Sequence, residues 1–270
     1  MMFLRNKAFT LVELLVVISI IALLLGVLMP ALGAARSQGK AVVCKSNLRQ
    51  LVLANTGYAT ENNGYYVPAA SDMWLVVGPL HGGLHRWHGV RVSWNEPFDP
   101  LKGPLVKYLA DGKVKECPGK INFIKDETSF EKGCGGYGYN MTYIGSRMWS
   151  DNTYTNTTYE TTARDCEIRQ PAQTIMFADT AFYSNDQHLI EYSFTEPPLI
   201  VYNGNPMTGF YSLPSIHFRH RNKANIGWID GHISSEKMTD FKITAYNGIN
   251  SSDVMLGWFG PLDNSLFDLK

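Results

Sequence analysis

The sequence lacks a net charge, because 24 lysines and arginines balance 24 aspartates and glutamates. This balance excludes the broad basic surface that binds nucleic acid, so we expect no nucleic-acid partner. Four cysteines are too few for a disulfide-dense scaffold. The chain has no P-loop, Rossmann glycine pattern, HExxH or nucleophile elbow, and we predict that it is not an enzyme. Hydrophobic residues make up 45% and charged residues 18%, which indicates a folded chain.

The N-terminus does contain a long apolar run. Arg5 and Lys7 precede it, and no residue is charged from position 14 to position 32. As a helix this run covers about 28 Å, close to the thickness of a bilayer's hydrocarbon core. The positive-inside rule places the N-terminus in the cytoplasm and everything after Arg36 outside. We therefore expect a single-pass inner-membrane protein whose remaining residues are periplasmic.

Glu13 does not fit a plain membrane anchor, because it lies at the start of the apolar run. A carboxylate there costs about 2.5–3.5 kcal/mol on insertion scales, so a partner is expected. Phe9 and Glu13 are spaced i, i+4 on one helix face. Cleavage between Ala8 and Phe9 would create an ammonium group near this carboxylate, or near that of an adjacent copy. Such pairing would set the axial register of packed helices.

Residues 5–17, with the sequence RNKAFTLVELLVV, resemble the class III signal of type IV prepilins and type II secretion pseudopilins. The resemblance implies that a prepilin peptidase cuts before Phe9 and methylates its new amine, and that Glu13 acts in assembly. The family usually has glycine before the cut, where this chain has Ala8. Pro30 also matches the family, in which a proline kinks or melts the helix after the span.

Two other interpretations of the N-terminus stay open. A secretory signal peptide would have a shorter apolar core of about 7–15 residues and a small-residue cleavage site, for which Ala31-Leu32-Gly33 is a candidate. A generic membrane anchor would explain the apolar run, but neither Glu13 nor the leader pattern.

The helix is predicted to continue beyond the membrane. Cys44, Leu48, Leu51, Asn55 and Tyr58 form one helical stripe, and the sequence Asn-Asn-Gly at 62–64 is a stop signal. We expect a leader peptide at 1–8, a helix at 9–62 whose membrane and assembly part is 9–32, and a globular head at 63–270. Glycines and Pro30 favour a flexible or unwound zone at the junction.

The head is expected to be rich in short strands separated by turns. The class is thus α+β: a pilin-like fold with a long N-terminal helix packed on a C-terminal antiparallel sheet. A short helix is predicted at 104–110 and an exposed loop or hairpin at 151–162. Strands are predicted at 74–77, 90–94, 136–143, 174–178, 216–219, 225–229 and 232–235.

A second resemblance lies near the C-terminus, where His220, Asp230 and Gly231 fit the pattern H-x9-D-G. This pattern is similar to that of the DUF1559 group of prepilin-like proteins. Smaller pieces also resemble that group: C-x-x-N-L-x-Q from Cys44, Cys117-Pro118, Gly138-Tyr139-Asn140 and Phe177-Ala178-Asp179.

In physical terms, Asp230-Gly231 predicts a tight turn between two strands. If residues 216–220 pair with the strand at 224–229, His220 and Asp230 lie at opposite ends, about 20 Å apart. They could not then share one metal. We therefore interpret the motif as specifying a hairpin, and we leave a metal or catalytic role of His217, His220, Asp230 and His232 as the alternative.

Other polar groups have structural and functional interpretations. His81, His85 and His88 could suggest a metal site, but the neighbouring glycines argue against the helix that would align them. Arg219, His220, Arg221 and Lys223 could meet an acidic polymer, although a solvated turn is preferred. Residues 151–162 and 263–268 are rich in oxygen donors, so calcium is possible. We otherwise expect no cofactor and no metal.

The cysteines are expected to form disulfides in the oxidising space outside the inner membrane. Four cysteines allow three pairings. We favour Cys44 with Cys117, which would tie the helix to the head, and Cys134 with Cys166. A zinc site is the alternative, although no C-x2-C pair is present.

These observations predict a structural subunit of a type IV pilus-like or type II secretion pseudopilus filament. Its expected partners are other copies, other pilin-like subunits, the prepilin peptidase and methyltransferase, and an inner-membrane assembly platform. The alternative is a minor or adhesive pilin-like protein whose aromatic-rich head, with six tryptophans, binds glycans or another extracellular ligand.

Overall fold

The structure is a computed structural model. It describes residues 10–73, 76–77, 80–81, 83–94, 96–119, 123, 131–150, 155–184, 187–245 and 248–270. The chain divides into two compact units, Met1–Gly39 and Lys40–Lys270. The boundary falls inside the long helix α1 (Leu11–Glu61), so the C-terminal part of that helix belongs to the same unit as the strands.

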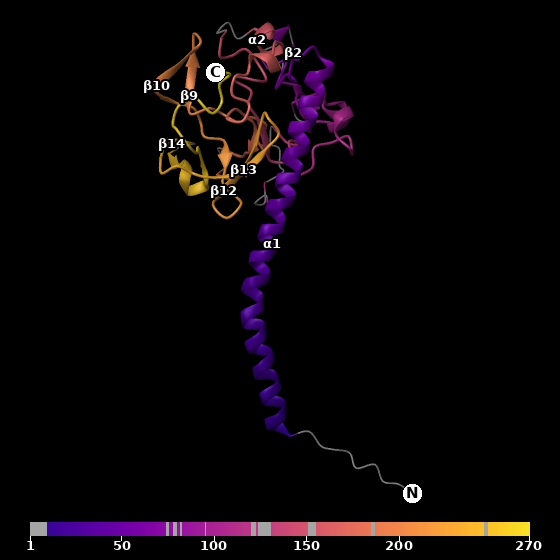
Figure 1. Cartoon of the computed structure of the whole chain (residues 1–270), viewed down its shortest axis with the longest axis vertical. Coiled ribbons are helices and arrows are strands. Elements are labelled where there is room, and N and C mark those ends of the chain that lie inside the picture. The colour runs from indigo at the N-terminus through magenta and orange to yellow at the C-terminus, as the bar shows by residue number, and fades with distance from the viewer. Residues whose placement is uncertain are drawn as a thin grey trace. The chain divides into compact units, whose positions relative to one another are not determined.

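Figure 1 shows α1 in indigo, the early strands such as β2 in purple, and the later strands such as β9, β10 and β12 to β14 in orange to yellow. The other helical elements are short: α2 (Asn156–Glu160) and the 3-10 helices η1 (Pro100–Lys102), η2 (Val106–Tyr108), η3 (Asp165–Glu167) and η4 (Ser251–Val254). The strands are β1 (Val76–Val77), β2 (Leu80–His81), β3 (His85–Arg86), β4 (Gly89–Val90), β5 (Tyr137–Tyr139), β6 (Ile175–Asp179), β7 (Phe182–Tyr183), β8 (Leu189–Ile190), β9 (Leu199–Tyr202), β10 (Asn205–Tyr211), β11 (Ile216–His217), β12 (Lys223–Trp228), β13 (Ile233–Lys237), β14 (Thr244–Ala245), β15 (Ile249–Asn250) and β16 (Leu256–Gly257).

Helix α1 ends at the predicted stop signal. The side chain of Asn62 donates to the carbonyl oxygen of Tyr58 at 2.7 Å, and the Gly64 amide donates to that of Ala59 at 2.8 Å. Asn63 and Gly64 have φ of 55° and 84°, a left-handed conformation that asparagine and glycine tolerate. The last turn thus has partners for its carbonyls.

A four-stranded antiparallel sheet forms the centre of the larger unit, in the order β13-β12-β6-β5. The C-terminal part of α1 belongs to the same hydrophobic core through Cys44, Leu48, Leu51 and Val52. A Cβ on Gly227 of β12 would lie only 2.8 Å from the side chain of Val52, so helix and sheet approach closely there. This packing confirms the predicted α+β class.

The predicted stripe on α1 is also confirmed. Cys44, Leu48, Leu51 and Asn55 are buried, and Tyr58 is half-buried against the core. Asn55 has a polar role inside this apolar face, because its side-chain oxygen accepts the Val67 amide at 3.0 Å. Aromatic rings fill the sheet side of the core: Phe177 stacks on Tyr139 with centroids 4.8 Å apart and meets Trp87 at 5.0 Å.

Several element predictions were wrong in detail. Residues 90–94 are not a strand beyond Val90, because Arg91 turns its guanidinium back to the Gly83 carbonyl at 2.8 Å. The region predicted as a loop or hairpin at 151–162 contains the short helix α2, and residues 151–154 lie outside the described part. The helix predicted at 104–110 is reduced to η2. Of the strand predicted at 74–77, only β1 is described.

The predicted pairing of residues 216–220 with the following strand was mostly wrong. Only His220 and Lys223 exchange backbone hydrogen bonds, at 2.9 and 3.2 Å, around a tight turn. Both edges of β12 are occupied, one by β13 and the other by β6. Strand β11 therefore pairs with β16 instead. The hairpin of β12 and β13 around Asp230-Gly231 is confirmed, with Gly227 opposite Ile233.

Candidate functional site

The N-terminus of α1 is built as a capping box. The Thr10 amide and hydroxyl both donate to Oε2 of Glu13, at 2.8 and 2.7 Å, and the Glu13 amide donates to the Thr10 hydroxyl at 3.2 Å. This reciprocal arrangement satisfies backbone donors that the first helical turn leaves open. Thr10 was missed in the sequence analysis, although T-x-x-E before an apolar run is its signature. Ala8 and Phe9 lie outside the described residues, so the predicted cleavage site and amine partner stay predictions.

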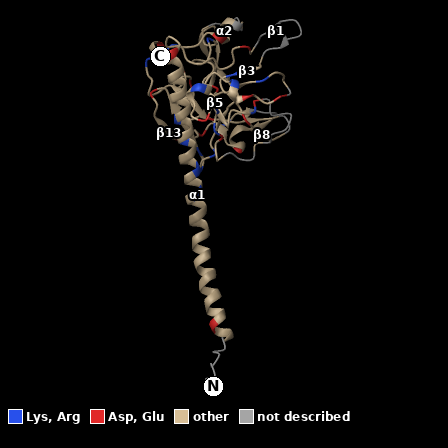
Figure 2. Cartoon of the chain, turned by 90° about the vertical axis from the view of Figure 1, so that its right-hand side faces the viewer, with Lys and Arg blue, Asp and Glu red and all other residues tan. Residues whose placement is uncertain are grey.

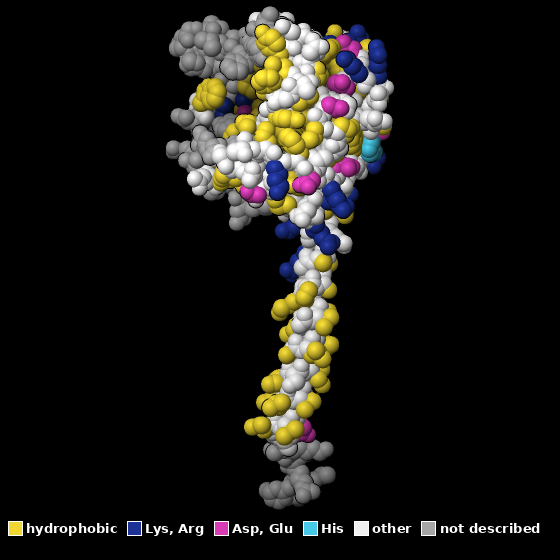
Figure 3. All heavy atoms as spheres, turned by 90° about the vertical axis from the view of Figure 1, so that its left-hand side faces the viewer, with side chains coloured by type: hydrophobic (Ala, Val, Ile, Leu, Met, Phe, Trp, Pro, Cys, Tyr) yellow, Lys and Arg dark blue, Asp and Glu magenta, His cyan; other side chains and the backbone are white. Residues whose placement is uncertain are grey.

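The helix behind this cap exposes apolar side chains on all sides. Large hydrophobic residues from Leu11 to Leu32 are about half to three-quarters exposed, for example Leu11 at 78% and Leu23 at 70%. Figure 3 shows such side chains along the N-terminal part of α1 on the face in view, and Figure 2 shows this part free of charge apart from one acidic position near its start. A helix that is apolar all round requires lipid or other helices around it.

Within the described residues, α1 is the helix long and apolar enough to cross a membrane, by length and composition. It remains helical through Pro30, so the expected unwound zone is not present in this structure. Pro30 has no amide to donate and leaves the Gly26 carbonyl without its usual helical partner. A kink at Pro30 stays a prediction.

The H-x9-D-G residues do not form one site. Asp230 and His232 close the β12–β13 turn: Oδ1 of Asp230 accepts the His232 amide at 3.0 Å and lies 2.6 Å from Nδ1 of its ring. Gly231 has φ of 94°. His220 lies at the other end of β12, and His217 is buried in β11. The hairpin interpretation of the motif is therefore supported by the geometry.

His220 instead belongs to a buried polar cluster that the sequence analysis did not assemble. Its Nε2 lies 3.3 Å from Sγ of Cys117 and 3.4 Å from Oδ2 of Asp179. Cys44 donates from its thiol to Oδ1 of Asp179 at 3.1 Å. Arg219, fully buried, forms an ion pair with the same carboxylate at 3.2 Å. Four of the short sequence matches thus converge, from α1, the loop after η2, the end of β6 and the turn before β12.

Burial and neighbouring charges set the ionisation in this cluster. Burial raises the pKa of Cys44, whereas the neighbouring Cys44 side chain lowers the pKa of Cys117, aided by Arg219 and His220. Burial also raises the pKa of Asp179, although Arg219 opposes this effect.

The four cysteines have free thiols in this structure. The sulfur atoms of Cys44 and Cys117 lie within 4.8 Å of each other without a bond between them. Their predicted disulfide therefore stays a prediction. Cys134 is buried with its thiol 3.9 Å from Glu191, while Cys166 is exposed in η3. The bridge between Cys134 and Cys166 is likewise not formed here.

The three histidines at 81, 85 and 88 do not share a described site. His85 is exposed, whereas His88 is buried with Nε2 2.8 Å from the Ser193 hydroxyl. The side chain of His81 lies outside the described part. Of the predicted basic cluster, Arg219 and His220 are buried, so the preferred interpretation as a solvated turn was wrong for these two residues, and neither is available to an acidic polymer.

The C-terminal segment expected to offer calcium ligands is tied into the fold. Asn264 donates to the Tyr143 hydroxyl and the Leu199 carbonyl, each at 2.9 Å, and its oxygen accepts the Leu199 amide at 2.8 Å. Asp263 accepts from both the amide and the hydroxyl of Ser265 in a local turn. Calcium binding stays a prediction.

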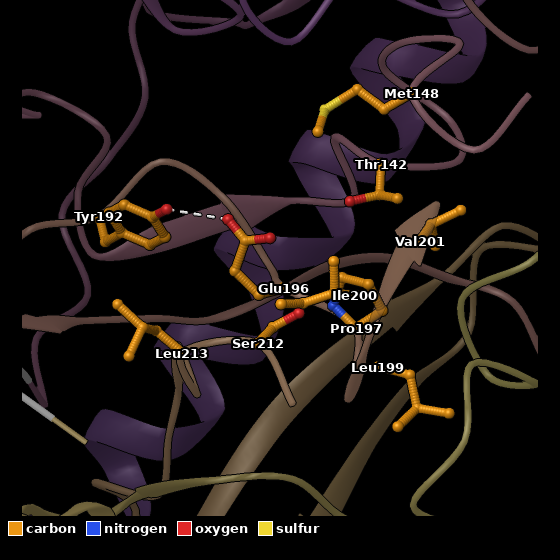
Figure 4. A pocket seen from close by; sticks show the side chains of 10 residues that line it. All are labelled: Thr142, Met148, Tyr192, Glu196, Pro197, Leu199, Ile200, Val201, Ser212 and Leu213. Atoms are coloured by element: carbon orange, nitrogen blue, oxygen red, sulfur yellow. Dashed lines mark hydrogen bonds between the residues drawn. The ribbon is translucent and has the colours of Figure 1, made fainter. Parts of the chain in front are cut away.

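A cavity of about 280 Å³ opens beside β9, and Figure 4 shows its lining. Its single carboxyl group, on Glu196, accepts from the Tyr192 hydroxyl at 2.8 Å, and Leu199, Val201 and Leu213 make the walls apolar. One carboxyl held by one phenol provides neither a metal ligand set nor an acid–base pair.

The tryptophans mostly pack in the core, because Trp87, Trp228 and Trp258 are buried. Trp94, in contrast, is largely exposed.

A capped, apolar N-terminal helix in one chain with an antiparallel α+β domain matches a pilin-like fold. Residues 4–29 match the family model of the prokaryotic N-terminal methylation motif. A 62-residue stretch, 23% of the chain, is 47% identical to the type IV wide pilus major component PilA4 of Thermus thermophilus. The match spans 47% of that relative's length. No solved structure matches the chain.

These matches confirm the resemblance to type IV pilin-like proteins. The resemblance to the H-x9-D-G group is not tested by them and stays a prediction.

Proposed function

We propose that the chain is a structural subunit of a type IV pilus-like or pseudopilus filament, assembled through its N-terminal helix. The observation that carries the proposal is the methylation motif at residues 4–29 followed by an apolar helix surface exposed on all sides. A helix of this kind can leave the lipid without exposing its apolar surface to water when that surface is buried again among copies of itself.

In this proposal the precursor is anchored in the inner membrane with its N-terminus in the cytoplasm and its head outside. Prepilin peptidase cleaves between Ala8 and Phe9 and methylates the new amine. An assembly platform then transfers the mature chain into the filament, beside other copies and other pilin-like subunits. N-terminal sequencing and mass measurement of the protein from its native envelope should find a methylated Phe9. A chain that still begins at Met1, or one cut after the apolar run, would contradict the proposal.

Glu13 acts in assembly by pairing with the Phe9 amine of a neighbouring subunit. Thr10 holds the carboxylate toward the start of the helix, where such an amine would arrive. The pairing needs the negative charge, whereas the cap needs only a side-chain acceptor.

Two substitutions separate these roles. Glu13→Gln keeps the cap and removes the charge, and Glu13→Ala removes both. We expect both variants to be inserted and cleaved but absent from sheared filaments, whereas the exposed head variant Glu96→Ala assembles normally. Normal assembly of Glu13→Gln would show that the charge is not used.

A further inference from the structure

Four side chains with metal-binding atoms meet inside the larger unit. Cys44, Cys117, Asp179 and His220 each offer one ligand atom, and these atoms all lie within 4.8 Å of one another. All four residues are buried. They come from α1, a loop, a strand and a turn, so the fold itself brings them together.

The spacing suits a tetrahedral ion. With zinc–sulfur bonds of about 2.3 Å and zinc–nitrogen or zinc–oxygen bonds of about 2.0–2.1 Å, neighbouring ligand atoms lie about 3.3–3.8 Å apart. The Cys117 Sγ to His220 Nε2 and the His220 Nε2 to Asp179 Oδ2 distances are 3.3 and 3.4 Å. The Cys44 Sγ to Asp179 Oδ1 distance is 3.1 Å. Separations of up to 4.8 Å between the ligand atoms must shorten by up to about 1 Å for one ion to bind all four atoms.

Charge also permits an ion here. Two thiolates and one carboxylate carry three negative charges, a divalent cation carries two positive charges, and the buried Arg219 beside Asp179 supplies the third. The loaded site is therefore neutral, so burying it leaves no unpaired charge.

Neighbouring groups hold the ligands in place. The Asn225 amide donates to Oδ2 of Asp179 at 2.8 Å, and the Tyr137 hydroxyl donates to Sγ of Cys44 at 3.6 Å. Gly119 leaves room for the imidazole, because a Cβ there would lie 2.4 Å from a ring carbon of His220. Such outer contacts orient metal ligands and are costly to remove.

A disulfide between Cys44 and Cys117 explains the cluster less well. Oxidation would remove the thiol hydrogen that Cys44 donates to Asp179 and would leave His220 facing a sulfur that is only a weak acceptor. Asp179 and His220 would then be buried with fewer partners, which is costly. A metal ion satisfies all four groups at once.

We propose that Cys44, Cys117, Asp179 and His220 bind one structural zinc ion. Two sulfurs, an imidazole and a carboxylate in a closed tetrahedral set are the donors that zinc prefers. The ion links α1 to the sheet and to two loops of the larger unit. This site replaces the expectation of a metal-free protein and does not rest on the proposed role in filament assembly.

The test uses the full chain, purified in detergent without a metal-affinity tag and without added metal. Elemental analysis should find one zinc per chain. Cys117→Ser and His220→Gln should each weaken zinc retention at least about tenfold. Cys166→Ser and His232→Gln, which alter an exposed cysteine and an exposed histidine outside the cluster, should keep one zinc. Loss of zinc in these controls as well, or no zinc in the unaltered chain after addition of the ion, would overturn the site.

A second measurement does not depend on how the variants fold. Cobalt(II) added to the zinc-depleted, unaltered chain should give the absorption of a tetrahedral site with thiolate ligands. Thiol alkylation should modify Cys44 and Cys117 only after chelation or unfolding. A peptide in which these two cysteines are joined and resist alkylation until they are reduced identifies the disulfide instead and refutes the zinc site.

Discussion

At the scale of single residues, Thr10 is the position whose role is most local. Its hydroxyl donates to the Glu13 carboxylate and accepts the Glu13 amide. We expect Thr10→Ala to weaken the first turn of α1 by about 0.5–2 kcal/mol, whereas Thr10→Ser keeps the cap. Hydrogen exchange at the Glu13 amide of the detergent-solubilised chain measures this effect, and equal protection in the two variants would contradict it.

Because of His88, we expect the stability of the head to depend on pH. Burial, with help from Arg86 and Arg91, holds its pKa well below the usual range. As the pH falls below about 6.5, the His88 imidazole becomes protonated in the unfolded chain but not in the folded chain. The contribution of His88 to the free energy of unfolding is therefore fully present above this pH and decreases as the pH drops below it. We expect His88 to contribute a loss of about 1.4 kcal/mol per pH unit in this range.

Urea unfolding followed by tryptophan fluorescence between pH 7 and pH 5 checks this prediction. His88→Gln should flatten the pH dependence by about one proton, even if it lowers stability at every pH. The exposed His85→Gln is the matched control for the substitution itself. An unchanged slope in His88→Gln would show that this imidazole does not titrate on unfolding.

Sequence patterns predicted some residue roles well and could not predict others. The buried stripe on α1 was predicted correctly, because it follows from local spacing, which a helix converts directly into a shared face. The neighbourhood of His220 could not be predicted in this way. Its contacts with Cys117 and Asp179 join positions far apart in the sequence, and only the finished sheet brings them together.

At the scale of elements, the β12–β13 hairpin depends on its turn. Gly231 has φ of 94°, a region costly for any residue with a Cβ except asparagine or aspartate. We expect Gly231→Val to lower the free energy of unfolding by about 1–2 kcal/mol and Gly231→Asn to cost much less. Among the described residues, no atom other than those of its two chain neighbours lies within 4 Å of the added Cβ, so the effect reports backbone strain. Equal stability of the two variants in urea unfolding would contradict the strain.

The elements also differ in how far the sequence determines them. The long helix was predicted to within two residues at its start and one at its end, because periodicity and the 62–64 stop signal act locally. The partner strand of β11 was not predicted correctly, because β11 pairs with β16 only once β6 has occupied the other edge of β12. Short strands carry too few residues to specify a distant partner.

At the scale of the whole molecule, the two compact units predict where the chain can be cut. A chain that begins at Lys40 keeps the buried stripe with its core and loses the exposed apolar surface. We expect the fragment 40–270 to be soluble without detergent and to unfold cooperatively. A fragment 63–270 lacks Leu48, Leu51 and Val52 and should aggregate, because it exposes the core that they cover. Gel filtration of both fragments checks this, and equal solubility would contradict the packing.

The tie between the C-terminal segment and the sheet has a consequence for the time at which the head can fold. The side chain of Asn140 donates to the Phe267 carbonyl at 2.8 Å, and the Ile175 amide of β6 donates to that of Leu266 at 2.8 Å. Phe267 and Leu269 are themselves buried. The middle strands thus complete their hydrogen bonds only after residues 266 and 267 have been synthesised. A nascent chain halted before these residues holds a head that is not fully folded and that can still pass through a translocation channel as an unfolded polypeptide.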